Sequence, residues 1–111
     1  PVAREAQARF VSAGGRMVTF AGVLPQCAVV VDAVLGIGLS RAPDDAAASV
    51  LDAINAARVP VLALDVPSGV DAGSGVAHPG AVRAARTLEF IAPKAGLRTG
   101  AARGPVGVLA L

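Results

Sequence analysis

The sequence predicts an α/β layered fold, in which strands and helices alternate around a mostly parallel sheet. Residues 27–36 and 59–65 are almost continuously apolar and rich in β-branched side chains. Such stretches are typical of strands in a parallel sheet that is covered on both faces. An amphipathic stretch at residues 43–58 lies between them and supplies the helix that a parallel crossover requires. Hydrophobic residues make up 54% of the chain and charged residues 16%, which is enough apolar material for a core. We therefore expect a single domain over residues 1–111.

The chain opens with a pattern of helical spacing. Val2, Ala6 and Phe10 recur on one face of residues 1–13, and the glycines that follow are typical helix breakers. Residues 16–20, RMVTF, then predict a short strand. Because the chain begins at Pro1 without a methionine, we expect it to be a piece of something longer.

The remaining elements follow in alternation. After the strand at residues 27–36, Pro43 and the acids behind it suit the start of the helix at residues 43–58. A loop rich in Gly, Ser and Pro follows the strand at residues 59–65. Two further strands are expected at residues 87–93 and 106–111, and the glycine-rich segment between them is too polar for a long helix.

Composition excludes several classes of function. The net charge is +2, the basic residues are scattered and aromatic residues make up only 3%, so nucleic acid is not an expected partner. One cysteine, Cys27, and one histidine, His78, make neither a disulfide nor a zinc site, and we interpret them as a small buried residue and a solvated loop residue. No apolar run approaches the roughly 18 residues that span a bilayer, and no secretory segment opens the chain, so a cytoplasmic location is expected.

A first polar cluster follows the strand at residues 27–36. Asp32 lies within an apolar run, where a carboxylate costs several kcal/mol unless a cation or hydrogen-bond donors compensate it. Either a bound cation or a structural hydrogen-bonding role toward a neighbouring loop accounts for it. Gly36 and Gly38 permit close backbone approach to a ligand, and loop amides with Ser40 can hold an anion, although a plain turn is the alternative. The dinucleotide fingerprint is not completed, because position 41 is Arg, so an ordinary dehydrogenase half ranks last.

A second polar cluster follows the strand at residues 59–65. Asp65, Ser68 and Asp71 place two carboxylates and a hydroxyl in one short loop, which suits acid/base chemistry or a hard cation. The alternative is an Asx or Ser turn that only satisfies backbone amides. Lys94 follows a later strand, and its ammonium can reach a phosphate or a catalytic carboxylate, or else it is an ordinary exposed lysine.

Three motifs carry a resemblance to a known family. VVVDAVLGIGLSR, then VPVLALDVPSGVDAGSG running on to APKAGL, and a closing GPVGVLAL occur in the order typical of the NAD(P)H-hydrate epimerases, also called the YjeF N-terminal domain. The chain resembles this family from about Ala28 onward. The resemblance implies a Rossmann-like three-layer αβα sandwich with a mostly parallel sheet, here truncated at its N-terminal side, since the family's upstream Asn-Asn-Gly-Gly-Asp-Gly segment has no counterpart.

The resemblance also implies an activity. Such enzymes interconvert the R and S epimers of hydrated NADH or NADPH, and an ADP- or ATP-dependent dehydratase, fused or separate, consumes the S form. The family is often dimeric and binds one K⁺ per subunit. The alternative is a non-catalytic module that binds nucleotide or protein and lacks the phosphate-binding loop.

Site residues are carried over from the resemblance position by position. Asp32 and Ser68 match the potassium ligands, and Asp65 matches the aspartate that faces the damaged nicotinamide ring, which makes it the candidate general acid/base. Lys94 is a candidate catalytic helper. Besides Asp65, the residues that match the substrate-binding loop are Gly36, Ile37, Gly38, Leu39, Ser40, Arg41 and Ala42.

Overall fold

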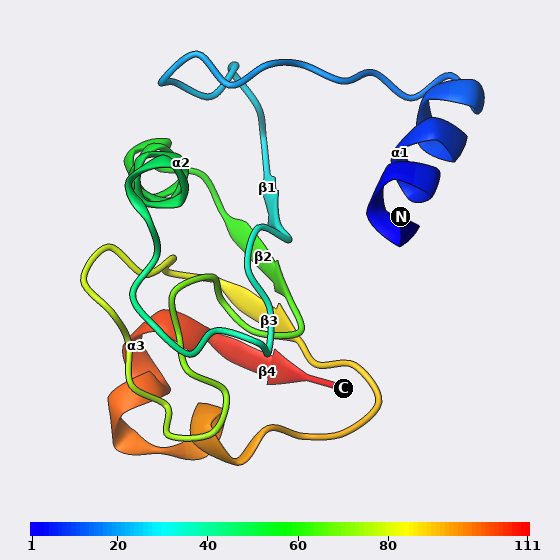
Figure 1. Ribbon diagram of the computed structural model, residues 1–111. Helices are drawn as coiled ribbons and strands as arrows, with labels where there is room; N and C mark the ends of the chain where they lie inside the picture. Colours follow the sequence, from blue (N-terminus) through cyan, green and yellow to red (C-terminus); the bar gives the residue numbers. More distant parts are fainter.

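A four-stranded, all-parallel sheet organises the protein. The computed structural model describes all of residues 1–111, and its strands lie in the order β1-β2-β3-β4 (Figure 1). This arrangement confirms the predicted α/β, Rossmann-like class. The strands are β1 (Val30–Asp32), β2 (Val61–Leu64), β3 (Arg86–Leu88) and β4 (Val108–Ala110). The helices are α1 (Val2–Ser12), α2 (Asp45–Ala56) and α3 (Arg103–Val106), with 3₁₀ turns η1 (Ala95–Arg98) and η2 (Gly100–Ala102).

Helix α2 forms where the sequence predicts it. The Asp44 side chain accepts a hydrogen bond from the Ala47 amide at 2.8 Å and so satisfies one of the unpaired N–H groups at the start of the helix. Leu51 and Ile54, three residues apart, are buried and pack against Val61 of β2. This packing holds the loop before α2 at one end of the sheet.

The two faces of the sheet differ in their cover. Val30 pairs with Val61, and this row faces α2. Val31 and Val108 lie on the opposite face and are 55% and 57% exposed. The expectation that the strands are covered on both faces is therefore wrong for β1 and β4, because no helix packs against the second face. Figure 1 shows α2 and α3 on one side of the sheet and α1 well apart on the other.

Residues 16–20 do not form the predicted strand. They pair with no neighbour, and Met17 and Val18 are 55% and 70% exposed. A strand needs a partner for its backbone hydrogen bonds, and this segment passes away from the sheet, so the apolar pattern has nothing to pair with. Helix α1 is confirmed as a helix, but it buries none of its residues.

The strands are shorter than the sequence predicts. The strand expected at residues 27–36 is reduced to β1, and the one expected at 87–93 ends at Leu88. Pairing with a four-residue β2 limits both neighbours, since a ladder extends only as far as its partner. The expected absence of a long helix after Lys94 is confirmed, because only η1, η2 and the four-residue α3 occur there.

The loop after β2 is packed rather than solvated. Gly69 has φ of 93°, and a side chain there would meet Ala81 at 2.8 Å, so only glycine fits this turn. A buried cluster fixes the loop against the short helices near the C-terminus. Its members are Val66, Val70, Ala72, Ala81, Leu97, Ala102 and Val106. The turn that carries Asp65 and Ser68 is consequently held by packing on both of its sides in sequence, at Val66 and at Val70.

Candidate active site at the carboxyl edge of the sheet

Three carboxylates follow the ends of three neighbouring strands. Asp32 is the last residue of β1, Asp65 follows β2 directly and Glu89 follows β3 directly. Because the strands are parallel, these ends meet at one edge of the sheet, which is where α/β folds bind their ligands. Each carboxylate has a different set of partners, and those partners decide what it can do.

Asp32 is fully buried and is satisfied by the loop that follows β2. The Ser68 hydroxyl donates to its Oδ1 at 2.6 Å, the Ser68 amide to its Oδ2 at 2.8 Å, and the Val34 amide to Oδ1 at 3.3 Å. Hydrogen bonds to a neighbouring loop therefore compensate the buried charge, which was one of the two explanations that the sequence left open. No cation is required to account for the position of Asp32.

Ser68 also anchors the loop that follows β1. Its hydroxyl oxygen accepts a hydrogen bond from the Leu35 amide at 2.8 Å and lies 3.2 Å from the Leu35 carbonyl oxygen. A carboxylate, a hydroxyl and a carbonyl oxygen thus gather between Asp32, Ser68 and Leu35. Such oxygens are the ligands that hard cations take in proteins. The same contacts fix the start of the loop at residues 36–42, here called the glycine loop.

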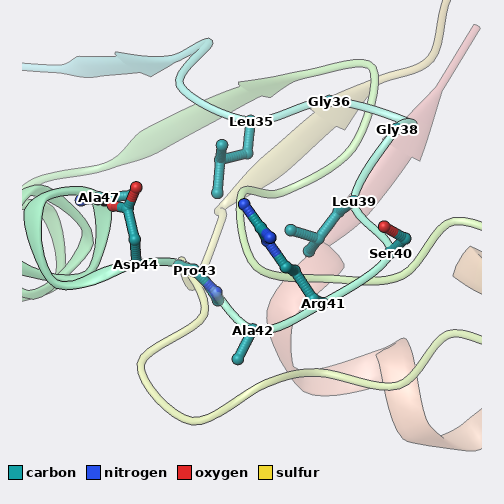
Figure 2. A pocket seen from close by; sticks show the side chains of 10 residues that line it. All are labelled: Leu35, Gly36, Gly38, Leu39, Ser40, Arg41, Ala42, Pro43, Asp44 and Ala47. Atoms are coloured by element: carbon teal, nitrogen blue, oxygen red, sulfur yellow. Dashed lines mark hydrogen bonds between the residues drawn. The ribbon is translucent and has the colours of Figure 1, made fainter.

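The glycine loop borders a cavity of about 340 Å³ in front of α2. Figure 2 shows the Arg41 side chain extending across this cavity, while Ser40 points away from its centre. Arg41 is the only basic residue in the lining. Asp44 also lines the cavity, but its carboxylate caps the Ala47 amide, so the start of α2 already has its anion. Arg41 is then the group that can attract an anionic ligand here.

Asp65 and Lys94 form an ion pair on a second cavity of about 470 Å³, which they share with Ile37 of the glycine loop. Asp65 Oδ1 accepts hydrogen bonds from the Lys94 ammonium and, at 2.9 Å, from the Phe90 amide. Lys94 Nζ also donates to the Phe90 carbonyl at 2.6 Å. The two side chains are 21% and 11% exposed, so both are largely buried at the wall of this cavity.

The ion pair decides the protonation state of Asp65. Burial by itself raises the pKa of this carboxyl, but hydrogen bonds from Lys94 and the Phe90 amide outweigh it, and the pKa lies below its ordinary value of 3.8. Asp65 is therefore ionised at neutral pH and available to accept a proton. Its backbone has φ of 69°, a left-handed conformation that Asp adopts more readily than most residues.

Glu89 and Arg98 are functional-site neighbours that sequence reasoning missed. Glu89 Oε2 and Oε1 accept hydrogen bonds from the Arg98 guanidinium at 2.8 and 3.0 Å, which lowers the pKa of the Glu89 carboxyl despite its burial. The available signal was an acid inside the apolar stretch TLEFIAP, the same kind of signal that drew attention to Asp32.

One known protein family matches most of this chain. The family described as YjeF-related protein N-terminus matches residues 1–96. The chain belongs to the YjeF N-terminal family. The match begins at the first residue and so includes α1, which the structure holds apart from the sheet.

Relatives of this YjeF-type chain carry names from one area of metabolism. The chain is 43% identical over 110 residues to the bifunctional NAD(P)H-hydrate repair enzyme Nnr of Escherichia coli (strain K12). The matched residues cover 97% of this chain and 21% of that protein. The chain is 44% identical over 75 residues to the NAD(P)H-hydrate epimerase of Weissella koreensis, 68% of this chain and 34% of that protein. It is 53% identical over 75 residues to the NAD(P)H-hydrate epimerase of Bordetella pertussis (strain Tohama I), 64% and 33% respectively. The YjeF-type chain thus spans between 21% and 34% of the length of these relatives.

Some predicted residues lie outside the site of the YjeF-type chain. Asp71 does not face Asp65 or Ser68. It closes its own Asx turn, accepting hydrogen bonds from the amides of Gly73 and Ser74 at 3.0 and 2.6 Å, which is the structural alternative that the sequence left open. His78 is half-buried, and it lines a different cavity from the one beside Asp65.

No three His, Cys, Asp or Glu side chains gather closely enough to bind a metal ion by themselves. No helix has the length and the apolar character that crossing a bilayer requires.

Proposed function

We propose that this YjeF-type chain catalyses, or forms part of a protein that catalyses, the epimerisation of hydrated NADH and NADPH. The observation that carries the proposal is the Asp65–Lys94 ion pair on a cavity at the carboxyl edge of the sheet. Relatives named as NAD(P)H-hydrate epimerases and repair enzymes support it, and they favour catalysis over a module that only binds.

The ion pair can supply a balanced proton transfer. In the hydrated ring the added hydroxyl sits on a carbon next to the ring nitrogen, so the carbon–oxygen bond breaks when the Lys94 ammonium protonates the hydroxyl and the nitrogen lone pair forms the iminium. Because Asp65 and Lys94 touch each other, they act on the same face of the ring, so the planar iminium turns over before water adds to its other face. Asp65 takes the proton of that water and returns it to Lys94. An ionised Asp65 beside a protonated Lys94 is the starting state that this scheme needs.

The two cavities suit the two parts of the substrate. Apolar side chains of Ile37, Phe90 and Ile91 line the cavity beside Asp65 and match a nicotinamide ring. Arg41 crosses the neighbouring cavity and matches an anionic phosphate. The glycine loop at residues 36–42 borders both, which supports its proposed role in substrate binding.

We also propose that Asp32 and Ser68 bind K⁺. The donor set fits, because a carboxylate, a hydroxyl and the Leu35 carbonyl gather there. Both oxygens of Asp32 already accept hydrogen bonds, so the ion would bind to a cluster of oxygens that does not need it to compensate an unpaired buried carboxylate. Bound K⁺ would supply positive charge beneath the glycine loop. Thermal denaturation in KCl against NaCl tests this, with a higher midpoint in KCl expected for wild type and no difference expected for Asp32→Asn.

The decisive test of the proposed function follows epimer interconversion by chromatography, using the natural protein that carries these residues. Asp65→Asn should lower kcat by at least about 100-fold, because general acid/base catalysis contributes about 10²- to 10⁴-fold. Asparagine tolerates the left-handed backbone at this position, so the fold should persist. Asp71→Asn, in the nearby Asx turn, is the matched control. An unchanged rate in Asp65→Asn removes this residue from the mechanism.

The remaining expectations are part of the same proposal. An ADP- or ATP-dependent dehydratase, fused or separate, would consume the product, and the relatives named as bifunctional repair enzymes support a fused arrangement. Homodimer formation is tested by light scattering, and a cytoplasmic location by cell fractionation.

A further inference from the structure

Glu89 is a charged side chain that the scheme above does not use. It follows β3, and its side chain is completely buried. Arg98 of η1 forms a bidentate ion pair with it, and the Arg98 side chain is 46% exposed. Burying the Glu89 carboxylate has a desolvation cost that offsets the attraction of Arg98, so the pair is weak evidence for stability and its presence calls for another explanation.

The same two side chains form hydrogen bonds with the backbone of Lys94. Glu89 Oε1 accepts a hydrogen bond from the Lys94 amide at 2.6 Å, and Arg98 donates to the Lys94 carbonyl at 3.2 Å. Both polar backbone groups of Lys94 are therefore held by side chains that form an ion pair with each other, and its carbonyl also accepts a hydrogen bond from the Leu97 amide at 3.2 Å. The Lys94 side chain extends to Asp65 from this fixed point.

Neither Glu89 nor Arg98 lines the cavity that Asp65 and Lys94 share. Glu89 is sealed from it, so it has no route to a substrate. A lysine side chain has a flexible four-carbon stem, and the position of its ammonium depends on where its backbone is held. The Glu89–Arg98 pair supplies that constraint.

We infer that Glu89 and Arg98 are positioning residues, which fix the backbone of Lys94 so that its ammonium stays against Asp65. Their effect on catalysis rests on the proposed function, whereas their effect on the Asp65–Lys94 contact does not. The two consequences can therefore be measured separately.

The first readout is independent of turnover. Lys94 is the charged side chain that the structure sets against Asp65, so the titration of the Asp65 carboxyl, followed by carbon-13 NMR, reports their contact. Arg98→Leu should move the Asp65 titration to higher pH, toward that of an unpaired aspartate. Arg83→Leu, an exposed arginine that makes no ion pair, is the matched control and should leave the titration unchanged.

The second readout is kinetic. Misplacing a catalytic group by about 1 Å can cost about 100-fold in rate, so we expect Arg98→Leu to lower kcat by about 10- to 100-fold and to change KM less than about twofold. Arg98→Lys keeps a single donor and should restore part of the loss. If wild type does not interconvert the epimers, the proposed function fails, and the NMR titration still decides the positioning role.

A double variant separates positioning from stability. Glu89→Leu/Arg98→Leu removes the buried carboxylate and its half-exposed partner together, so neither charge is left unpaired. We expect this variant to melt close to wild type yet to keep the shifted Asp65 titration and the low kcat. A folded double variant with the wild-type titration and wild-type kcat would overturn the inference.

Discussion

At the scale of single residues, Asp32 and Asp65 show how position along a strand end sets the chemistry of a carboxylate. Asp32 is sealed from solvent and satisfied by the Ser68 and Val34 groups, which are neutral donors. Asp65 comes directly after its strand, opens onto a cavity and is paired with a cation. The first suits a structural or ion-binding role and the second suits proton transfer.

The hydroxyl of Ser68 should contribute measurably to stability. Ser68→Ala removes a buried donor to the Asp32 side chain, and we expect a loss of about 1–3 kcal/mol in the free energy of unfolding, measured with urea. Ser74→Ala is the matched control, because that hydroxyl also donates to an aspartate but is exposed. Its loss should stay within about 0.5 kcal/mol. Equal losses in the two variants would contradict the importance of burial.

The ion pairs should make stability depend on pH in the acidic range. The pKa values of Asp65 and Glu89 are lower in the folded protein than their ordinary values of 3.8 and 4.5, so their stabilisation is fully present above about pH 4.5 and is lost as the pH falls through the folded values. Urea midpoints measured from pH 7 to pH 2.5 should decline below that point. Glu89→Gln should flatten the decline, whereas Glu5→Gln on the exposed α1 should leave it parallel to wild type.

At the scale of elements, local signals were the predictable part of the fold. Helix α2 could be predicted, because its apolar spacing and its capping acid act within a few residues. Residues 16–20 were wrongly assigned, because a strand depends on a partner that local sequence does not reveal. The strand ends were displaced for the same reason.

In the candidate site, too, local sequence signals were predictable and contacts made by folding were not. The contact between Asp32 and Ser68 and that between Asp65 and Lys94 involve residues for which the sequence had suggested roles, since both pairs follow strand ends in recognisable motifs. Glu89 was not singled out, although it too interrupts an apolar run. Its partner, Arg98, is the last residue of η1, and only the folding of this 3₁₀ turn brings Arg98 against Glu89.

The cap of α2 gives a prediction at this scale. Asp44→Ala should lower the free energy of unfolding by about 1 kcal/mol, because it leaves the Ala47 amide without its acceptor. Asp44→Asn retains a capping oxygen and should stay close to wild type in the same urea measurement. A comparable loss in both variants would mean that the charge of Asp44, rather than its cap, matters.

At the scale of the whole molecule, the asymmetry of the sheet stands out. One face is covered by α2 and by the packed loops near the C-terminus, while Val31 and Val108 on the other remain in contact with solvent. Parallel sheets are usually covered on both faces. Helix α1, with its apolar residues unburied, adds nothing to the core in this arrangement.

Removing residues 1–15 should therefore leave the rest of the chain almost as stable as before. We expect the thermal midpoint to change by no more than about 2 °C, because α1 buries no residue. Leu51→Ala, a fully buried position in α2, is the contrast and should cost about 2–5 kcal/mol. A large loss on truncation would mean that α1 docks on the bare face of the sheet in solution.

The order of the strands has a consequence for how the protein is made. Each strand pairs with the one before it in the chain, so no strand has to be inserted between two others that are already in place. As the polypeptide leaves the ribosome, β2 can dock on β1, then β3 on β2, and finally β4 on β3, in the direction of synthesis. Every step adds one strand to an existing edge, and the hydrogen bonds between Ser68 and the residues that follow β1 need only the first two strands in place.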